Sequence, residues 1–253
     1  GDHTITAVAD TYNQRPQPNT VTTSGEVHLI GPKFGTSAIS FPGVAANTLQ
    51  IGASSDFNYG TGDWTVELFA NKAQDLDSSL YAFHSGNPTI EIRVDANERP
   101  MLECQSVEGT DYQITGSNGD VTRNKWHHIA GVKNGANLTL YLDGVAIATR
   151  SDLTGNFGNS TGTTYLGGRV GSKLYGGYLD DIRASDTARY TADFTPPTET
   201  FTSDSNTMLL IHGPATDAAT SFTDSSSSGH TITTEGDVIS FIPKIGAGAL
   251  VFG

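Results

Sequence analysis

One stretch of the chain, WHHIAGVKNGANLTLYLDGVAIAT (126–149), restricts the possible fold more than any other. It contains three runs rich in β-branched and aromatic residues, separated by Asn134-Gly135 and Asp143-Gly144. These dipeptides are strong hairpin signals, because tight hairpin turns need positive φ at their central positions. The stretch therefore predicts a meander of three antiparallel strands.

Strand patterns dominate the rest of the sequence as well. The segments DWTVELFAN (63–71) and TIEIRVD (89–95) alternate apolar and polar residues with the period of a half-buried strand. Pro196-Pro197 prevents a helix or a central strand from continuing there. Many short strands with regular turns and almost no helical periodicity predict an all-β fold, a β-sandwich or jelly roll of two antiparallel sheets.

The end of the chain repeats its beginning. Aligned without a gap, GEVHLIGPKFGTSAISF (25–41) and GDVISFIPKIGAGALVF (236–252) share seven identical residues. The tetrapeptide HTIT precedes both, at 3–6 and at 230–233. Two matched segments in the same order indicate that the opening of a domain is duplicated rather than a short solenoid unit.

Composition excludes several classes of protein. The net charge of −13 argues against binding to nucleic acid or to an anionic membrane surface. No apolar run approaches the roughly 18 residues that a membrane-spanning helix needs, so we expect no membrane insertion. Cys104 is the only cysteine, so no intramolecular disulfide can form, and its apolar surroundings predict a buried thiol.

Four motifs in order resemble a known family. The meander, FGTSAISFPG (34–43), DWTVELF (63–69) and YGGYLDDIR (175–183) are similar to laminin G-like, concanavalin A-like lectin-glucanase jelly-roll domains. The resemblance covers roughly the first 200 residues, and this fold hosts lectins, adhesion domains and hydrolases. The segment from 188 to 213 resembles the junction of tandem members, a type found in phage virion proteins and bacterial surface proteins.

These comparisons predict one sandwich over 1–201, followed by the opening strands of a second copy over 202–253. Nothing at the start of the chain corresponds to TMLLIH (207–212), so the first copy lacks a leading strand and leaves a sheet edge unpaired. We expect the assembly strand carrying Thr207, Leu209 and Ile211 to add to a sheet, either on its own domain or on a neighbouring subunit. A neighbour or a longer chain is the favoured option.

The resemblance implies two candidate ligand sites. Laminin G-like domains often bind Ca²⁺ at the rim, and the matching residues here are Asp181 and Asp224, whose carboxylates suit this hard cation. The alternative is structural: Asp224 forms an Asx turn with Ser226, and Asp181 caps a strand.

Family members that bind glycans place them at rim loops. The matching loops contain Asn156, Asn159 and Arg169, with Tyr175 as a stacking face. Ordinary polar loops of a sandwich are the alternative interpretation.

No enzyme motif is complete. Glycosidases of this fold carry E-x-D-x-x-E on one strand, but the nearest string is RVDANE (93–98), with Arg93 in place of the first Glu. Asp95 and Glu98 then belong to a polar turn. His127 and His128 are adjacent on a strand and point to opposite faces, so both rings cannot hold one metal ion.

We therefore predict a protein without enzymatic activity that acts outside the cell or on a virion surface. The main hypothesis is a structural or assembly module of a tail, fibre, decoration protein or surface filament that polymerises by strand exchange with other copies. The alternative is a carbohydrate-binding, lectin-like module. A glycoside hydrolase is a remote third possibility.

Overall fold

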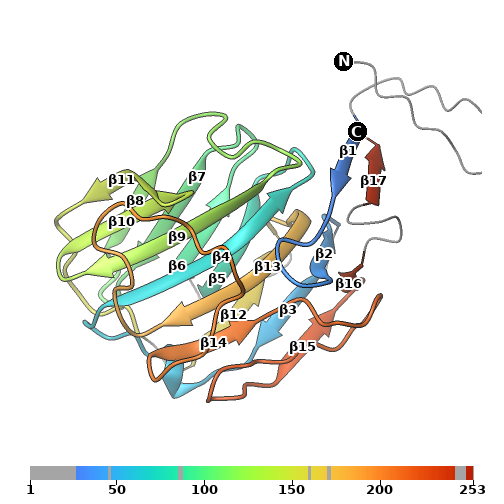
Figure 1. Ribbon diagram of the computed structural model, residues 1–253. Helices are drawn as coiled ribbons and strands as arrows, with labels where there is room; N and C mark the ends of the chain where they lie inside the picture. The colour runs from blue at the N-terminus through green and yellow to red at the C-terminus, as the bar shows by residue number, and fades with distance from the viewer. Residues whose placement is uncertain are drawn as a thin grey trace, which may run out of the picture.

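The computed structural model describes residues 27–44, 47–84, 88–158, 161–169, 172–242 and 249–252. Their strands form two stacked antiparallel sheets and a separate two-stranded ribbon (Figure 1). Each sheet turns alternate apolar side chains toward the other, which is the arrangement of a β-sandwich. The predicted all-β jelly roll of two antiparallel sheets is confirmed.

The eight-stranded sheet lies at the front in Figure 1. Its strands follow the order β11-β10-β9-β4-β13-β2-β16, and β14 also pairs with β13. Their bounds are β11 (Val145–Arg150), β10 (Asn137–Leu142), β9 (Trp126–Asn134), β4 (Trp64–Lys72), β13 (Gly176–Ser185), β2 (Ala38–Pro42), β16 (Ile239–Phe241) and β14 (Thr207–Ile211).

The seven-stranded sheet lies behind and follows the order β15-β3-β12-β5-β6-β7-β8. Its bounds are β15 (Ile232–Glu235), β3 (Thr48–Ile51), β12 (Thr163–Leu166), β5 (Ser78–His84), β6 (Pro88–Val94), β7 (Pro100–Gln105) and β8 (Asp111–Thr115). The ribbon consists of β1 (Val27–Ile30) and β17 (Ala249–Phe252), and a single 3₁₀ turn, η1 (Ser55–Phe57), completes the described elements. No helix in the described ranges is long and apolar enough to span a membrane.

The predicted meander is confirmed as β9, β10 and β11, which pair in sequence order. At the second turn, Asp143 and Gly144 have φ values of +48° and +82°, as a primed hairpin turn requires. Gly144 is needed for a second reason, because a Cβ there would lie 1.9 Å from the carbonyl oxygen of Phe194. The turn thus holds the segment that follows β13 against the meander.

The core lies between the two sheets. Trp64 is fully buried in it, as are Ile92 and Leu102 of the opposite sheet. Cys104 is also buried, as expected, and burial raises the pKa of its thiol, so it stays protonated and unreactive. The sandwich therefore relies on packing of apolar side chains rather than on covalent links.

The strand β13 organises the eight-stranded sheet. One edge pairs with β4, while the other pairs first with β2 (Gly176–Leu179) and then, beyond an irregularity at Asp180 and Asp181, with β14. Asp181 has a φ of +45°, which marks the point where one neighbour replaces the other. The strand β14 thereby fills the edge that the first copy leaves open.

The part of the chain after residue 201 belongs to the same sandwich. The strands β14 and β16 extend the eight-stranded sheet, and β15 forms one edge of the seven-stranded sheet. Among the described residues, these strands dock on the first domain, which is one of the two arrangements that the sequence left open for 202–253. Sequence similarity located the repeated segments. It did not indicate that β14, β15 and β16 pair with β13, β3 and β2.

Candidate functional site

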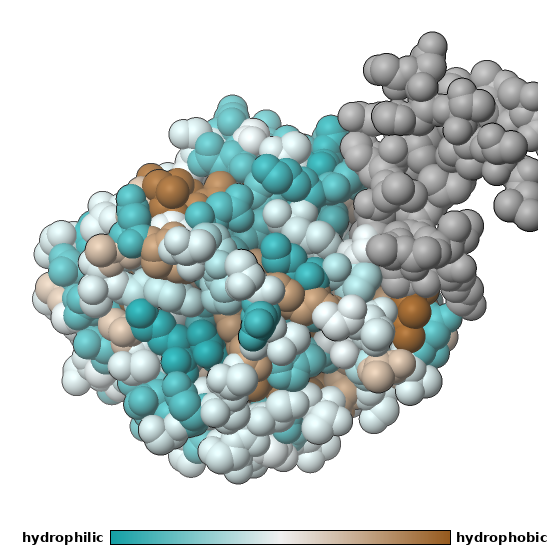
Figure 2. All heavy atoms as spheres, in the orientation of Figure 1, coloured by the Kyte–Doolittle hydropathy of each residue, from teal (hydrophilic) through white to brown (hydrophobic). Residues whose placement is uncertain are grey.

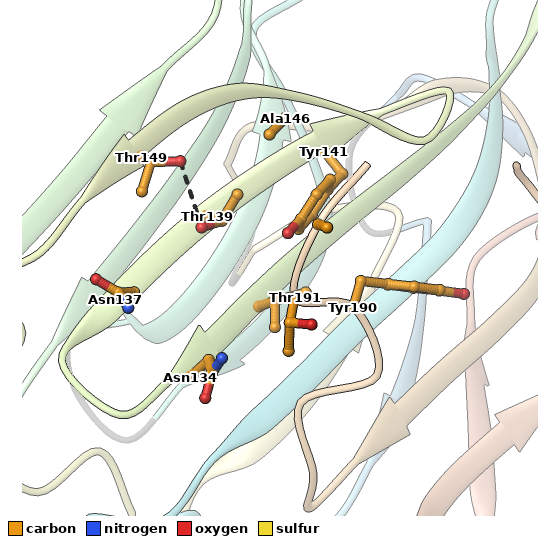
Figure 3. A pocket seen from close by; sticks show the side chains of 10 residues that line it. Asn134, Asn137, Thr139, Tyr141, Ala146, Thr149, Tyr190 and Thr191 are labelled. Carbon is orange, nitrogen blue, oxygen red and sulfur yellow. Dashed lines mark hydrogen bonds between the residues drawn. The ribbon is translucent and has the colours of Figure 1, made fainter. Parts of the chain in front are cut away.

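A groove runs along the outer face of the meander. We call it the β10 groove; it has a volume of about 290 Å³ and lies between the meander and the segment that returns after β13 (Figure 3). The residues that line it are Val132, Asn134, Asn137, Thr139, Tyr141, Ala146, Thr149, Tyr190, Thr191 and Ala192.

Strand alternation explains which side chains of β10 reach the groove. Leu138 and Leu140 point inward and are fully buried in the core. Thr139, between them, and Tyr141, which follows Leu140, therefore point to the outer face, because successive side chains of a strand face opposite sides of the sheet. The alternating pattern visible in the sequence thus sets the polar floor of the groove.

The aromatic wall of the groove comes from the returning segment. The rings of Tyr190 and Phe194 stack with centroids 3.6 Å apart, and the ring of Tyr141 meets Phe194 edge-on at 5.4 Å. The Tyr190 hydroxyl donates to Glu67 Oε2 at 2.7 Å. Burial and the charge of Glu67 raise the pKa of Tyr190, so this phenol is a neutral donor.

Glu67 anchors this wall from below. It is fully buried and accepts hydrogen bonds from Arg183 Nη2 at 2.6 Å and Arg183 Nε at 2.9 Å, and it lies 3.1 Å from His128 Nε2. Burial disfavours the carboxylate, but the hydrogen bond of His128 and the charge of Arg183 outweigh it and lower the pKa of Glu67. The groove wall therefore rests on an ionised, fully paired group.

The open side of the groove carries neutral polar groups. The side-chain amides of Asn134 and Asn137 make no hydrogen bond with any residue that the structure describes. The hydroxyl of Thr149 donates to that of Thr139 at 3.3 Å. None of the lining side chains is a carboxylate or a cation. Such a surface offers donors and acceptors to a neutral polar ligand, together with aromatic rings at one side.

The outer face of the seven-stranded sheet has a different chemistry. Glu91 of β6 lies directly opposite Glu103 of β7, and Arg169 reaches Glu91 at 3.2 Å. Lys173 lies 3.6 Å from Glu91 and 3.8 Å from Glu103. The sequence did not point to this pair, although both residues occupy outward positions of β6 and β7. Arg169 and Lys173 thus form ion pairs with these two carboxylates, and Glu91 is fully buried.

The predicted glycan residues do not come together. Tyr175 is fully buried and donates to the carbonyl oxygen of Tyr178, so its prediction as a stacking face is wrong. Arg169 pairs with Glu91 on the other sheet, and Asn156 accepts from the backbone of its own loop. Asn159 lies outside the described residues. None of these residues lines the β10 groove.

The predicted calcium residues do not fit a cation site. Asp224 accepts hydrogen bonds from the backbone amides of Leu210, Ser226 and His230, which includes the Asx turn considered as the alternative. A carboxylate surrounded by N–H donors is a poor ligand for Ca²⁺, which needs several converging oxygens.

Asp181 is oriented in the same way. Its Oδ2 accepts from the amide of Phe201 at 2.6 Å, and its Oδ1 lies 2.5 Å from Nδ1 of His212. Within the described ranges, no three His, Cys, Asp or Glu side chains converge as metal ligands would.

Two further expectations can be compared with the structure. Asp95 closes the turn between β6 and β7 by accepting from the amides of Asn97 and Arg99, so RVDANE is a polar turn, as predicted. The assembly strand β14 (with Thr207, Leu209 and Ile211) pairs with β13 of its own chain, and Leu209 and Ile211 are fully buried. Pairing with its own domain is one of the two options expected from the sequence.

These features define a lectin-type β-sandwich with a neutral groove. The model of the concanavalin A-like lectin/glucanases superfamily matches residues 43–193, which include the meander and the first part of the returning segment with Tyr190. The chain belongs to this superfamily. No curated protein sequence matches the chain significantly.

Solved structures share the fold at low identity. A candidate carbohydrate-binding protein from Bacteroides ovatus ATCC 8483 aligns over 87% of this chain and 62% of its own, with a TM-score of 0.60 and 14% identity. The heptameric SAP-like pentraxin of Limulus polyphemus aligns over 61% and 78%, with a TM-score of 0.47 and 16% identity. Domains LG4-5 of the mouse laminin alpha1 chain align over 64% and 47%, with a TM-score of 0.48 and 14% identity.

Proposed function

We propose that this protein is a carbohydrate-recognition module and that the β10 groove binds a neutral saccharide. The observation that carries the proposal is the chemistry of the groove, where amides and hydroxyls lie beside tyrosine rings with no charged side chain among them. Membership of a lectin and glucanase superfamily and the fold shared with a candidate carbohydrate-binding protein support the same conclusion. The virion or filament role expected from the sequence has no comparable support.

The groove suits sugar hydroxyls for a physical reason. Each hydroxyl both donates and accepts, and so does each side-chain amide, so Asn134 and Asn137 can exchange water for sugar without leaving a polar group unpaired. The apolar face of a pyranose can lie against the ring of Tyr190, which stays partly exposed and is fixed by its stacking on Phe194. The buried ring of Tyr141 packs edge-on against both and supports them. An anionic ligand would find no cation among the lining side chains, and Asp193, which accepts from the amide of Ala146 at 2.9 Å, would repel it.

The proposed activity is binding without cleavage. Hydrolysis needs two accessible carboxylates flanking the bond, one of which must be able to give up a proton. The groove has none, and the pair formed by Glu91 and Glu103 on the opposite sheet is held by Arg169 and Lys173. Incubation of the bound glycan with the protein should therefore leave it intact by mass spectrometry.

A glycan array followed by titration calorimetry tests the proposal. We expect binding to neutral rather than uronic or sulfated oligosaccharides. Replacement Asn137→Ala should weaken binding by about tenfold, the equivalent of one lost hydrogen bond to the ligand. The control is Asn118→Ala, an exposed asparagine in the turn after β8, which should bind like the parent. Equal binding by Asn137→Ala, or silence toward every neutral glycan, would contradict the proposal.

A further inference from the structure

The turn between β9 and β10, at one end of the β10 groove, carries an asparagine followed by glycine. Asn134 is the last residue of β9 and lies opposite Asn137, the first residue of β10 (Figure 3). Gly135 is exposed and has a φ of +57°, a conformation that glycine adopts at little cost. Because glycine has no side chain, the peptide nitrogen that follows Asn134 is unshielded, and this nitrogen is the atom that attacks an asparagine side chain when it deamidates.

The side chain of Asn134 is free to approach the backbone. Its amide has no hydrogen-bond partner in the part of the chain that the structure describes. The amide of Asn47, by contrast, is held by the carbonyl of Val44 and the N–H of Asp237. A Cβ built on Gly135 would meet no other atom within 4 Å, so the turn is surrounded by open space. Closure of a ring between the Asn134 side chain and the backbone therefore meets no steric obstacle.

A carboxylate lies against the attacking nitrogen. The N–H of Gly135 donates to Oδ1 of Asp63 at 2.7 Å. Asp63 directly precedes β4, which pairs with β9, so the sheet brings this residue beside the turn. The ammonium group of Lys133 lies 3.7 Å from the same oxygen and helps to keep it there. An amide nitrogen must lose its proton as it attacks a carbonyl carbon, and Asp63 is within reach to accept that proton.

A second Asn-Gly pair in the chain lacks such a carboxylate. Asn118 and Gly119 form the turn after β8, and both are exposed. Gly119 also has open space around it, but its N–H donates to the carbonyl oxygen of Asn97 at 2.9 Å. A carbonyl oxygen accepts a hydrogen bond without taking up the proton at neutral pH, whereas a carboxylate can do both. The two pairs share their sequence and differ in the acceptor.

We propose that Asn134 is a site of spontaneous deamidation, promoted by Asp63. The Gly135 nitrogen forms a bond to Cγ of Asn134 while its proton passes to Asp63. The bond from Cγ to Nδ2 then breaks, and the departing nitrogen takes that proton and leaves as ammonia. Water opens the resulting succinimide ring at either of its carbonyl carbons, which gives aspartate or isoaspartate. The sequence consumes water, releases ammonia and needs no oxidant or reductant.

The product introduces a negative charge into the β10 groove. Asn134 lines the groove, and none of the lining side chains is charged before the conversion. An ionised carboxylate only accepts hydrogen bonds, so the donors of the amide are lost. Isoaspartate also lengthens the backbone by a methylene group, which displaces Asn137 across the turn. Conversion should therefore weaken the binding of a neutral saccharide. This consequence rests on the proposed function of the groove, whereas the deamidation itself does not.

Peptide mapping by mass spectrometry, with the full chain aged at neutral pH, tests the deamidation. The chain contains its own control, because both Asn-Gly pairs are measured in the same sample. We expect Asn134 to convert at least about tenfold faster than Asn118, an effect that a positioned proton acceptor can supply. Equal rates at the two sites, or faster conversion at Asn118, would overturn the proposal.

The variant Asp63→Asn separates the basicity of the carboxylate from the shape of the turn. An amide oxygen at this position can still accept from Gly135, so the hydrogen bond is kept while the proton acceptor is lost. Conversion of Asn134 should slow by at least about tenfold, with conversion of Asn118 unchanged. A variant that melts like the parent and converts Asn134 at the parental rate would show that Asp63 has no part in the reaction. The comparison of the two pairs in the parent chain does not depend on how this variant folds.

Titration calorimetry with a neutral oligosaccharide selected on the glycan array tests the consequence for binding. Ion exchange separates converted from unconverted protein, since conversion adds a negative charge. We expect the converted fraction and the variant Asn134→Asp to bind about tenfold more weakly than fresh protein, the equivalent of one lost hydrogen bond. Equal affinity of all three would overturn the loss of binding. Fresh protein that binds no neutral glycan would contradict the proposed function, while the peptide map would still decide the deamidation.

Discussion

The outer faces of the two sheets both carry acidic side chains, but only one of them is covered. On the eight-stranded sheet, the segment that returns after β13 crosses the front of the molecule and buries Glu67 completely, together with His128 (Figure 1). On the seven-stranded sheet, Glu103 keeps 24% of its side chain exposed between Arg93 and Lys173. Figure 2, which views the covered side, shows mostly hydrophilic residues with small hydrophobic patches.

Strand alternation places polar residues on the outer face of both sheets. Whether water reaches them depends on the returning segment, which covers only the eight-stranded sheet. Under the returning segment the effective dielectric is low, so removing one partner leaves a buried charge uncompensated. On the open face, Glu103 stays in contact with water, which screens its ion pairs with Arg93 and Lys173, so little free energy depends on them. The Glu67–Arg183 pair therefore supports the groove wall, whereas the ion pairs of Glu103 mainly keep that face of the sheet hydrated.

The strongest test of this contrast is Glu67→Gln. The change leaves Arg183 buried without its counter-ion and removes an acceptor from Tyr190, so we expect a loss of about 3 kcal/mol in the free energy of unfolding, measured in urea. Binding to the β10 groove should weaken as well, because Tyr190 loses its anchor. A loss below about 1 kcal/mol would show that the covering segment does not exclude water as described.

Asp224 extends the test to a second kind of buried carboxylate. Loops bury it, and the returning segment does not cover it. Asp224→Ala removes the acceptor of three backbone amides, and we expect a loss of about 2 kcal/mol. Urea titrations with and without a chelator should give the same midpoint for the parent protein, since protein donors already occupy this carboxylate. A chelator-dependent midpoint that Asp224→Ala abolishes would restore the calcium hypothesis.

The pH dependence of stability probes a third buried group on the covered sheet. Burial raises the pKa of Asp180 to about 7, so the folded state holds this proton more tightly than the unfolded chain does. Its contribution is therefore present at about pH 4 and is lost as the pH rises through 7.

His212 acts in the same direction over this range. The hydrogen bond that His212 donates to Asp181 raises the pKa of His212, so its contribution is present below the ordinary pKa of histidine and is lost as the pH rises through the higher folded value. The urea midpoint should thus fall between pH 5 and pH 8, and Asp180→Asn should flatten that slope. An unchanged slope in the variant would contradict the assignment to Asp180.

The smallest effect is expected on the open face. Glu103→Gln removes one partner of Arg93 and of Lys173, yet all three side chains remain partly exposed, so the free energy of unfolding should change by less than about 1 kcal/mol. This variant is the matched control for Glu67→Gln. A loss as large as that of Glu67→Gln would remove the distinction between the two faces.

Much of the fold could be predicted, but little of the candidate site. Asn134-Gly135 and Asp143-Gly144 are local signals, so the meander and the outward position of Thr139 followed from a few neighbouring residues. The groove needs Tyr190, some 50 positions further along the chain, and nothing near Tyr190 in the sequence indicates where that segment returns. Tyr175 was misplaced for a related reason, since an aromatic residue beside a loop can point outward or into the core.

The ionisable groups show the same limit. Glu91 and Glu103 occupy outward positions that alternation predicts, but their direct opposition depends on the register between β6 and β7. The carboxylates of Asp181 and Asp224 suited calcium as isolated residues, and only the surrounding backbone amides revealed their structural role. Similarity to a family suggested a calcium site at these residues, but it did not reveal which groups hydrogen-bond to their carboxylates.

By itself, the sequence determined the strands, the tight turns, the two-sheet architecture and the existence of a repeated opening motif. All of these depend on alternation, turn residues and identity between segments, which are local or directly comparable along the chain. The tertiary structure alone decided which strands pair, that β14 closes its own sheet, that β1 pairs with β17, and that β16 pairs with β2. Pairing brings together residues far apart in sequence, and the free energy that selects a partner arises only when both edges are present.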